Sequence, residues 1–132
     1  FMKKDINIPE SKDIYIAAVL EKHPEYHTKD WNAYIINDGQ EPVEMALIVS
    51  KGFSDTKITA EFRHQVKLLP AKSYAKIEFL ESKVLALNNQ FSVTYFKGSK
   101  MFEKTFLFKV NTIKPENLKA LPVMKLEGIL GN

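Results

Sequence analysis

The sequence predicts an all-β protein in which two antiparallel sheets pack face to face. Apolar residues recur with period two in several short segments, as expected for strands with one buried face. Turn-forming residues separate these segments at intervals of roughly eight to twelve residues, and no long helical period interrupts them. We therefore expect an antiparallel β-sandwich of about seven strands.

The expected strands follow from local composition. DIYIAAVL is short, apolar and β-branched, as in a strand covered on both faces, and WNAYIIN resumes that pattern. Asn37, Asp38 and Gly39 then form a corner, because these residues tolerate positive φ and bond to their own backbone. The segments expected to be strands are residues 13–20, 31–37, 43–50, 58–68, 74–81, 91–96 and 101–110.

Alternation also predicts which side chains face the core. In the third strand one face carries Val43, Met45, Leu47 and Val49, and the other carries Glu44, Ala46, Ile48 and Ser50. In the fourth, Ile58, Ala60, Phe62, Val66 and Leu68 should form the buried face, and in the fifth Ala75, Ile77 and Phe79. VLALNN is expected to be an irregular crossover, and KGSK a tight hairpin with Gly98 in the left-handed region.

One domain accounts for the whole chain of 132 residues, with a core over 13–110 and a tail over 111–132. In the tail, PENLKAL has a proline suited to a first helical position and predicts a short helical turn. The remainder should dock through Leu126 and Leu130.

Composition excludes several function classes. The net charge of +3 is dispersed along the chain, and Arg63 is the only arginine, which weakens a phosphate-reading role. Without cysteine there is no disulfide framework, zinc–thiolate site or thiol nucleophile. The start, FMKKDINIPESKD, lacks the apolar core of a signal peptide, and no apolar run is long enough to span a membrane. We expect a cytoplasmic protein without membrane contact and without a cofactor.

The order of the elements resembles the immunoglobulin-like or fibronectin-type sandwiches of bacterial proteins. The likeness covers roughly residues 13–110 and rests on YIINDG, EPVEMALIV, LLPAKSYAKIEF and ALNNQFSVTYF. The paired cysteines of antibody domains are absent, so Trp31 is expected to be only a core residue. Such a resemblance implies a fold and leaves the activity open, because these sandwiches host many unrelated functions.

More narrowly, WNAYIINDGQEPVEMALIVSKGF and LLPAKSYAKIE resemble a group of short bacterial proteins often labelled phenylalanyl-tRNA synthetase alpha subunit. That label implies a class II synthetase domain, which is far longer and holds its nucleotide with two arginines, one of them after a glycine-rich motif. Arg63 alone cannot form both contacts, and no glycine-rich strand precedes it. We therefore expect the label to be an error.

Two groups of residues are candidate polar sites. His23 and His27, with Glu25 between them, are side chains that suit a divalent metal, but a loop does not fix their positions, and we expect HPEYH to be a solvated loop without a metal. His64 occupies a core-facing position next to Arg63, and a buried ring needs a hydrogen-bond partner. The alternatives for His64 are a satisfied half-buried histidine and a catalytic base, and the sequence places no serine or carboxylate beside it.

The last hairpin combines aromatic residues with interleaved lysines. The aromatic residues are Phe91, Tyr95, Phe96, Phe102, Phe106 and Phe108, and the lysines are Lys97, Lys100, Lys104 and Lys109. A single-stranded nucleic-acid platform uses stacking aromatics beside lysines in this way. A sandwich strand with one core face and one lysine-bearing face has the same pattern, so nucleic acid is the less favoured partner.

Three apolar residues, Ile36, Ile48 and Phe96, fall on the nominally polar faces of their strands. If they cluster, they form an exposed patch typical of an interface with a protein partner or a second copy; otherwise they lie under a loop or the C-terminal tail. The sequence thus favours a non-enzymatic binding or interaction domain. The alternatives are a lysine-rich nucleic-acid-binding domain and, following the label, a synthetase-related protein.

Overall fold

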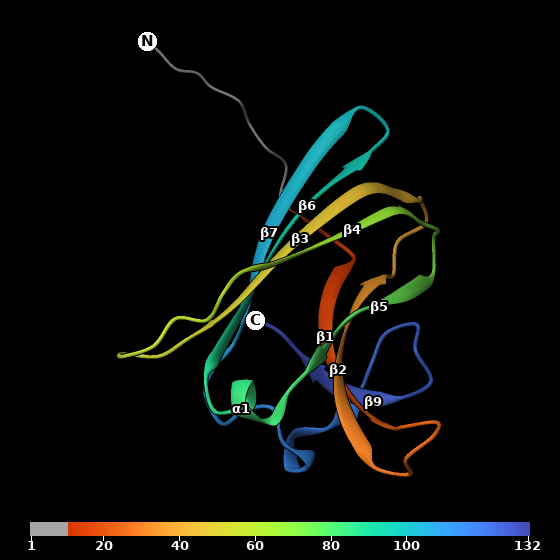
Figure 1. The fold of residues 1–132 in the computed structure, drawn as a ribbon. Coiled ribbons are helices and arrows are strands. Elements are labelled where there is room, and N and C mark those ends of the chain that lie inside the picture. Colours follow the sequence, from red (N-terminus) through yellow and green to blue (C-terminus); the bar gives the residue numbers. More distant parts are fainter. Residues whose placement is uncertain (1–10) are drawn as a thin grey trace.

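The computed structural model describes residues 11–132, so most of the segment that bears on a signal peptide lies outside it. Two antiparallel sheets pack face to face, which confirms the predicted β-sandwich (Figure 1). Neither helix in residues 11–132 has the length and apolarity needed to cross a membrane.

The first seven strands divide between the two sheets of the sandwich, three in one sheet and four in the other. One sheet contains β1 (Ile14–Lys22), β2 (Lys29–Asn37) and β5 (Ser73–Leu80), and β1 is flanked on its other side by β9 (Glu127–Leu130) and β8 (Lys119–Ala120). The second sheet has the order β4 (Phe62–Leu69), β3 (Val43–Phe53), β6 (Asn88–Lys97) and β7 (Lys100–Phe108). The short segments are α1 (Ser82–Leu85) and a 3₁₀ turn (Pro115–Asn117), which confirms the helical turn expected in the tail.

The core lies between the sheets and comes from alternate residues of their inner faces. Its largest fully buried side chains include Tyr95, Phe91, Phe106 and Phe108. Ile113 also packs in this core, so the tail contributes beyond the expected limit of residue 110. Trp31 is buried in the same cluster, as expected for a core residue.

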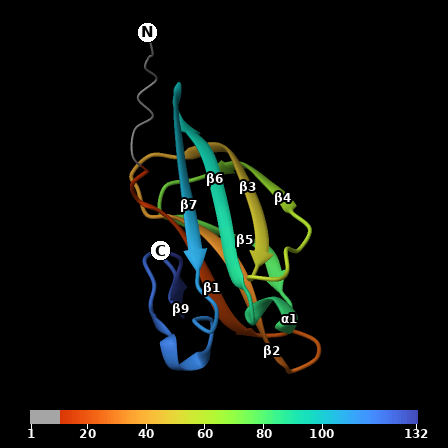
Figure 2. The same ribbon diagram turned by 90° about the vertical axis from the view of Figure 1, so that its left-hand side faces the viewer.

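The C-terminal segment forms strands that the sequence did not indicate. β9 pairs with β1, and beyond it the main chain of Asn132 makes two hydrogen bonds to Leu107 of β7, at 2.9 and 3.0 Å. The segment therefore links the two sheets along one side of the sandwich, which we call the closed side (Figure 2). The opposite side is bounded by the edge strands β4 and β5, and we call it the open side.

Two β-bulges change the predicted alternation. In β3, Met45 adopts a left-handed φ of 51°, and the register against β6 shifts between Glu44 and Leu47. Beyond that shift Ala46, Ile48 and Ser50 are buried, whereas Met45 and Leu47 are exposed, so the predicted inner face was wrong. The extra residue reverses the phase of the strand because side chains alternate with period two.

The second bulge lies where β5 pairs with β2. Ala33 is opposite Glu78 and Tyr34 is opposite Lys76, which leaves Ile77 as the extra residue of β5. Glu78 consequently faces inward on the side of Ala33, and Phe79 is 55% exposed instead of belonging to the core. β4 begins at Phe62, so Ile58 lies before it, and only part of the expected core face is covered because Ile58, Phe62 and Leu68 are all exposed.

Candidate functional site: the open-side cleft

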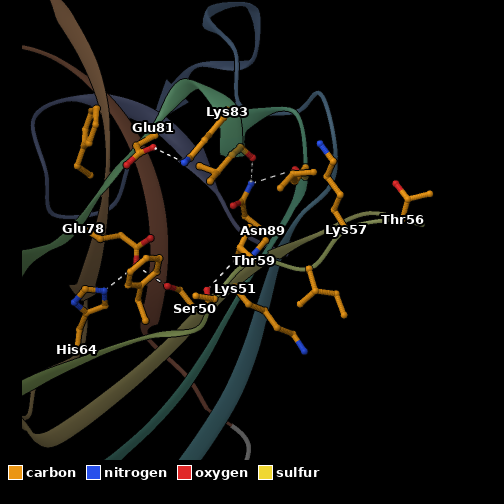
Figure 3. A pocket seen from close by; sticks show the side chains of 17 residues that line it. Ser50, Lys51, Thr56, Lys57, Thr59, His64, Glu78, Glu81, Lys83 and Asn89 are labelled. Atoms are coloured by element: carbon orange, nitrogen blue, oxygen red, sulfur yellow. Dashed lines mark hydrogen bonds and ion pairs between the residues drawn. The ribbon is translucent and has the colours of Figure 1, made fainter.

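Three polar side chains meet between the sheets on the open side. Ser50 of β3 donates a hydrogen bond to Oε1 of Glu78 on β5 at 2.6 Å, and Nε2 of His64 on β4 lies 2.8 Å from the same oxygen (Figure 3). Because a carboxylate oxygen only accepts, the His64 ring carries its proton on Nε2. His64 is thus half-buried, and its ring has a hydrogen-bond partner.

The order of these three groups limits their chemistry. In a nucleophile relay the imidazole lies between the hydroxyl and the carboxylate, whereas here the carboxylate lies between the hydroxyl and the imidazole. The Ser50 side chain is also buried, with 3% of the residue exposed. The hydrogen bonds from Ser50 and His64 to Glu78 connect the two sheets. These three side chains form the polar inner end of a cleft.

Sequence reasoning found His64 and missed its two partners. Counted from the start of their strands, Ser50 and Glu78 face inward because of the bulges at Met45 and Ile77. The sequence signal beside Glu78 is the apolar pair Phe79–Leu80, which follows it directly and breaks the alternation of β5. Ser50 carries no comparable signal.

The cleft around this group has a volume of about 920 Å³. It lies between the arm of the β3–β4 hairpin, residues 51–60, and the corner formed by the end of β5 and α1 (Figure 3). Three of its lining residues, Ile58, Phe62 and Phe79, are large apolar side chains that are more than half exposed. A cleft of this size with exposed apolar walls and a few convergent polar groups has the character of a ligand site.

Local hydrogen bonds hold both walls of the cleft. Thr59 fixes the arm, because its Oγ1 accepts the Gly52 N–H at 2.8 Å and its own N–H bonds to the Gly52 carbonyl at 2.8 Å. Asn89 fixes the opposite wall by donating from Nδ2 to the carbonyls of Val84 at 2.9 Å and Leu87 at 3.1 Å. Hydrogen bonds within the chain therefore hold both walls of the cleft.

The charges lining the cleft are unequally paired. Both of its carboxylates have a basic partner: Glu78 contacts His64, and Glu81 lies 3.4 Å from Lys83. Among residues 11–132, no carboxylate lies within 4.0 Å of Lys51 or Lys57, which also line the cleft. The local charge balance in the described chain therefore favours an acidic ligand.

Arg63, the other residue of the predicted polar site, does not line the cleft. Its guanidinium lies 3.8 Å from Glu61, and its side chain is 66% exposed. β4 turns His64 inward and Arg63 outward, because neighbouring residues of a strand face opposite sides. The structure thus separates the two residues that the sequence placed together.

The predicted interface patch is wrong in two of its three residues. Ile36 and Ile48 are both completely buried, and they belong to different apolar clusters. The bulge at Met45 turns Ile48 into the main core, and the C-terminal tail covers Ile36 through Met124. Phe96 alone lies on the outer face, paired with Met101 across the last hairpin.

The tail covers the outer face of the five-stranded sheet. There Ala17, Val19, Tyr34, Ile36 and Met124 form a second apolar cluster, with Leu121 and Val123 packed against it. The Tyr34 hydroxyl donates to Oε1 of Glu21 at 2.6 Å, and burial, followed by this contact with Glu21, strongly raises the pKa of Tyr34. This sheet therefore buries apolar side chains on both faces.

In the HPEYH loop, His23 bonds to the backbone of its own turn. Nδ1 of His23 accepts hydrogen bonds from the backbone N–H groups of Glu25 and Tyr26, at 3.1 and 3.3 Å, and so closes the turn. Within the described part of the chain, no three His, Asp or Glu side chains come together as a metal site requires. The loop thus matches the alternative reading of a solvated turn.

The aromatic residues of the last hairpin mostly belong to the core. Phe91, Tyr95, Phe106 and Phe108 are each at most 2% exposed, so these rings cannot stack on bases. Lys104 lies over the Phe106 ring, with Nζ 5.1 Å from its centroid. The buried rings and the position of Lys104 over one of them leave no open platform of these four aromatic residues.

Comparisons with models of known protein families, with curated proteins and with solved structures find no significant match.

Proposed function

We propose that the protein is a non-enzymatic binding domain whose ligand lies in the open-side cleft. The observation that carries this proposal is the position of Phe62. Phe62 pairs across the β3–β4 ladder with the buried Ser50, so the Phe62 side chain points toward the interior of the sandwich. Phe62 is nevertheless 57% exposed, because it borders a cleft of about 920 Å³. An inward-facing aromatic residue without a covering layer is an available contact surface.

The test is a titration of the isotope-labelled chain with a library of small aromatic and aliphatic compounds, followed by amide NMR. We expect shifts to concentrate at cleft residues such as Gly52, Thr59 and Val84, and Phe62→Ser to abolish them. Leu47→Ser is the matched control, because Leu47 is also exposed but lies on the outer face of β3. Shifts confined to the outer face, or none at all, would overturn the proposal.

The synthetase label leads to the opposite expectation, and a direct assay separates the two. ATP–pyrophosphate exchange and aminoacylation with the purified chain should both give no turnover. The position of Arg63, outside the cleft and next to Glu61, supports this expectation because a nucleotide clamp requires converging cations. Turnover that is lost in Arg63→Ala would contradict a non-enzymatic role.

A further inference from the structure

We infer that the ligand of the open side is an extended peptide that adds as a strand to β4. Its apolar and acidic residues alternate, so that the apolar side chains face the cleft and the acidic side chains face outward. This inference rests on the proposed function and specifies its ligand. It begins from the backbone of β4, which in residues 11–132 pairs only with β3. The other edge of this strand presents main-chain groups that a further strand can bond.

The two edges of the four-stranded sheet differ in how they resist such pairing. At β7 the inward-facing position opposite Val93 is Lys104, and a lysine on the inner side of an edge strand opposes the addition of another strand. At β4 the corresponding inward-facing residues are Phe62, His64 and Val66, and the strand contains no proline. The β4 edge is therefore the receptive one.

The closed side shows what a strand in this position does for the fold. There the C-terminal segment pairs with β1 and then bonds to Leu107 of β7, so that one extended segment joins both sheets. On the open side the described chain supplies no such segment, and the cleft opens between β4 and the end of β5. An incoming strand would complete the sandwich in the same way.

The chemistry of the peptide follows from the two faces of β4. On the inner face Phe62, His64 and Val66 line or adjoin the cleft, which calls for apolar side chains. On the outer face Arg63 and Lys67 alternate with them, and opposite charges on neighbouring strands attract. Lys51 and Lys57, which line the cleft itself, add further basic charge beside β4, so acidic residues are the complement.

The length of the peptide follows from the length of the edge. β4 has eight residues, and a strand of that length extends roughly 26 Å at about 3.3 Å per residue. An octapeptide is thus the appropriate probe. A random octapeptide library displayed on phage and selected against the full chain tests the inference without assuming a sequence.

We expect the selected peptides to alternate apolar residues with Asp or Glu, and their affinity to fall about threefold to tenfold between low and moderate salt. The double variant Arg63→Glu with Lys67→Glu should weaken them at least tenfold and should select basic peptides instead. The control is Lys97→Glu with Lys100→Glu, which changes the net charge equally at the tip of the last hairpin. Backbone N-methylation should abolish binding at every second peptide residue and be tolerated at the residues between them. The reason is that only alternate N–H groups of an added strand point toward β4 and bond to it.

The outcomes separate this inference from the proposed function. Neutral or basic peptides, equal effects of the two double variants, or tolerance of N-methylation in both phases would overturn strand addition by an acidic peptide. If no peptide is selected but small compounds still shift the cleft amides, the inference fails and the binding site stands. If neither probe binds, both proposals fall.

Discussion

The closed and open sides of the sandwich solve the same geometric problem differently. On the closed side a strand of the chain itself covers the gap between the sheets, and the aromatic core behind it is buried. On the open side the gap remains as a cleft, and a polar group bridges the sheets at its inner end. One side of the fold is thus closed and stabilised by the chain's own strand, and the other side keeps a cleft that is available for binding.

The largest expected difference in the free energy of unfolding is between substitutions of two phenylalanines, one on the closed side and one on the open side. Phe106→Ala should lower the free energy of unfolding by about 4 kcal/mol, because it leaves a cavity in a well-packed core. Phe62→Ala should lower it by less than about 1 kcal/mol, because more than half of that side chain is already in water. Urea denaturation of both variants measures the contrast, and equal losses would show that the open side is a second core.

The closed side can be broken directly at Gly128 of β9. A Cβ atom on this residue would lie 2.7 Å from the Ala18 carbonyl oxygen and 2.8 Å from Cδ1 of Leu121. Gly128→Val should therefore cost about 3 kcal/mol, because backbone cannot move aside as a flexible side chain can. Denaturation is again the measurement; a loss below about 1 kcal/mol would mean that β9 contributes little to closure.

The open side is held at one end by Asn37, the last residue of β2. Its Nδ2 donates to the carbonyls of Glu41 at 2.9 Å and of Leu69 and Pro70 at 3.1 Å each, so it ties the β4–β5 turn to the β2–β3 corner. Asn37→Ala should cost about 2 kcal/mol by leaving buried carbonyls unsatisfied. Faster amide hydrogen exchange across the β4–β5 turn should accompany the loss, and unchanged exchange there would contradict the role of Asn37 as a tie.

The smallest expected change in the free energy of unfolding concerns Tyr34, which lies under the C-terminal tail on the outer face of the five-stranded sheet. Its ordinary pKa of 10.0 is raised by burial and then by Glu21, so the neutral phenol is the form that the fold stabilises. This contribution is present below pH 10 and is lost as the pH rises toward the folded-state value. Tyr34→Phe should cost about 1 kcal/mol at neutral pH.

This role of Tyr34 can be checked by measuring the stability of the wild type and of Tyr34→Phe at alkaline pH. Above pH 10 the stability of the wild type should fall more steeply than that of Tyr34→Phe, since the variant has no phenol to ionise at this position. Parallel curves would show that Tyr34 does not carry the effect. Ultraviolet titration should show in the wild type a late-ionising phenol that the variant lacks.

Much of the fold could be predicted because period two and turn chemistry are local properties. The strands around Trp31, the corner at Asn37 and the hairpin at Gly98 all lie where their residues indicated. The pairing of β9 with β1 was not predictable in the same way. EGIL is too short to show a period, and its partner lies more than a hundred residues earlier in the chain.

The candidate site was predicted only in part for a related reason. His64 follows the undisturbed alternation of β4 and faces inward as expected, whereas Ile48 was assigned to the wrong face. A bulge is a property of two paired strands, and here one of them depends on a methionine in the left-handed region, which composition does not favour. The partners of His64 were therefore invisible until the pairing was known.

The bulges at Met45 and Ile77 have a consequence for how domains of this kind diverge. Loss of the codon for either bulge residue would restore simple alternation, and Ser50 and Glu78 would still face inward because their cross-strand partners would not change. Insertion of one further residue between a bulge and the end of its strand would instead exchange the inner and outer residues beyond the insertion, unless a second bulge absorbed it. Short insertions, more than substitutions, are thus a direct route by which such a cleft acquires a different lining.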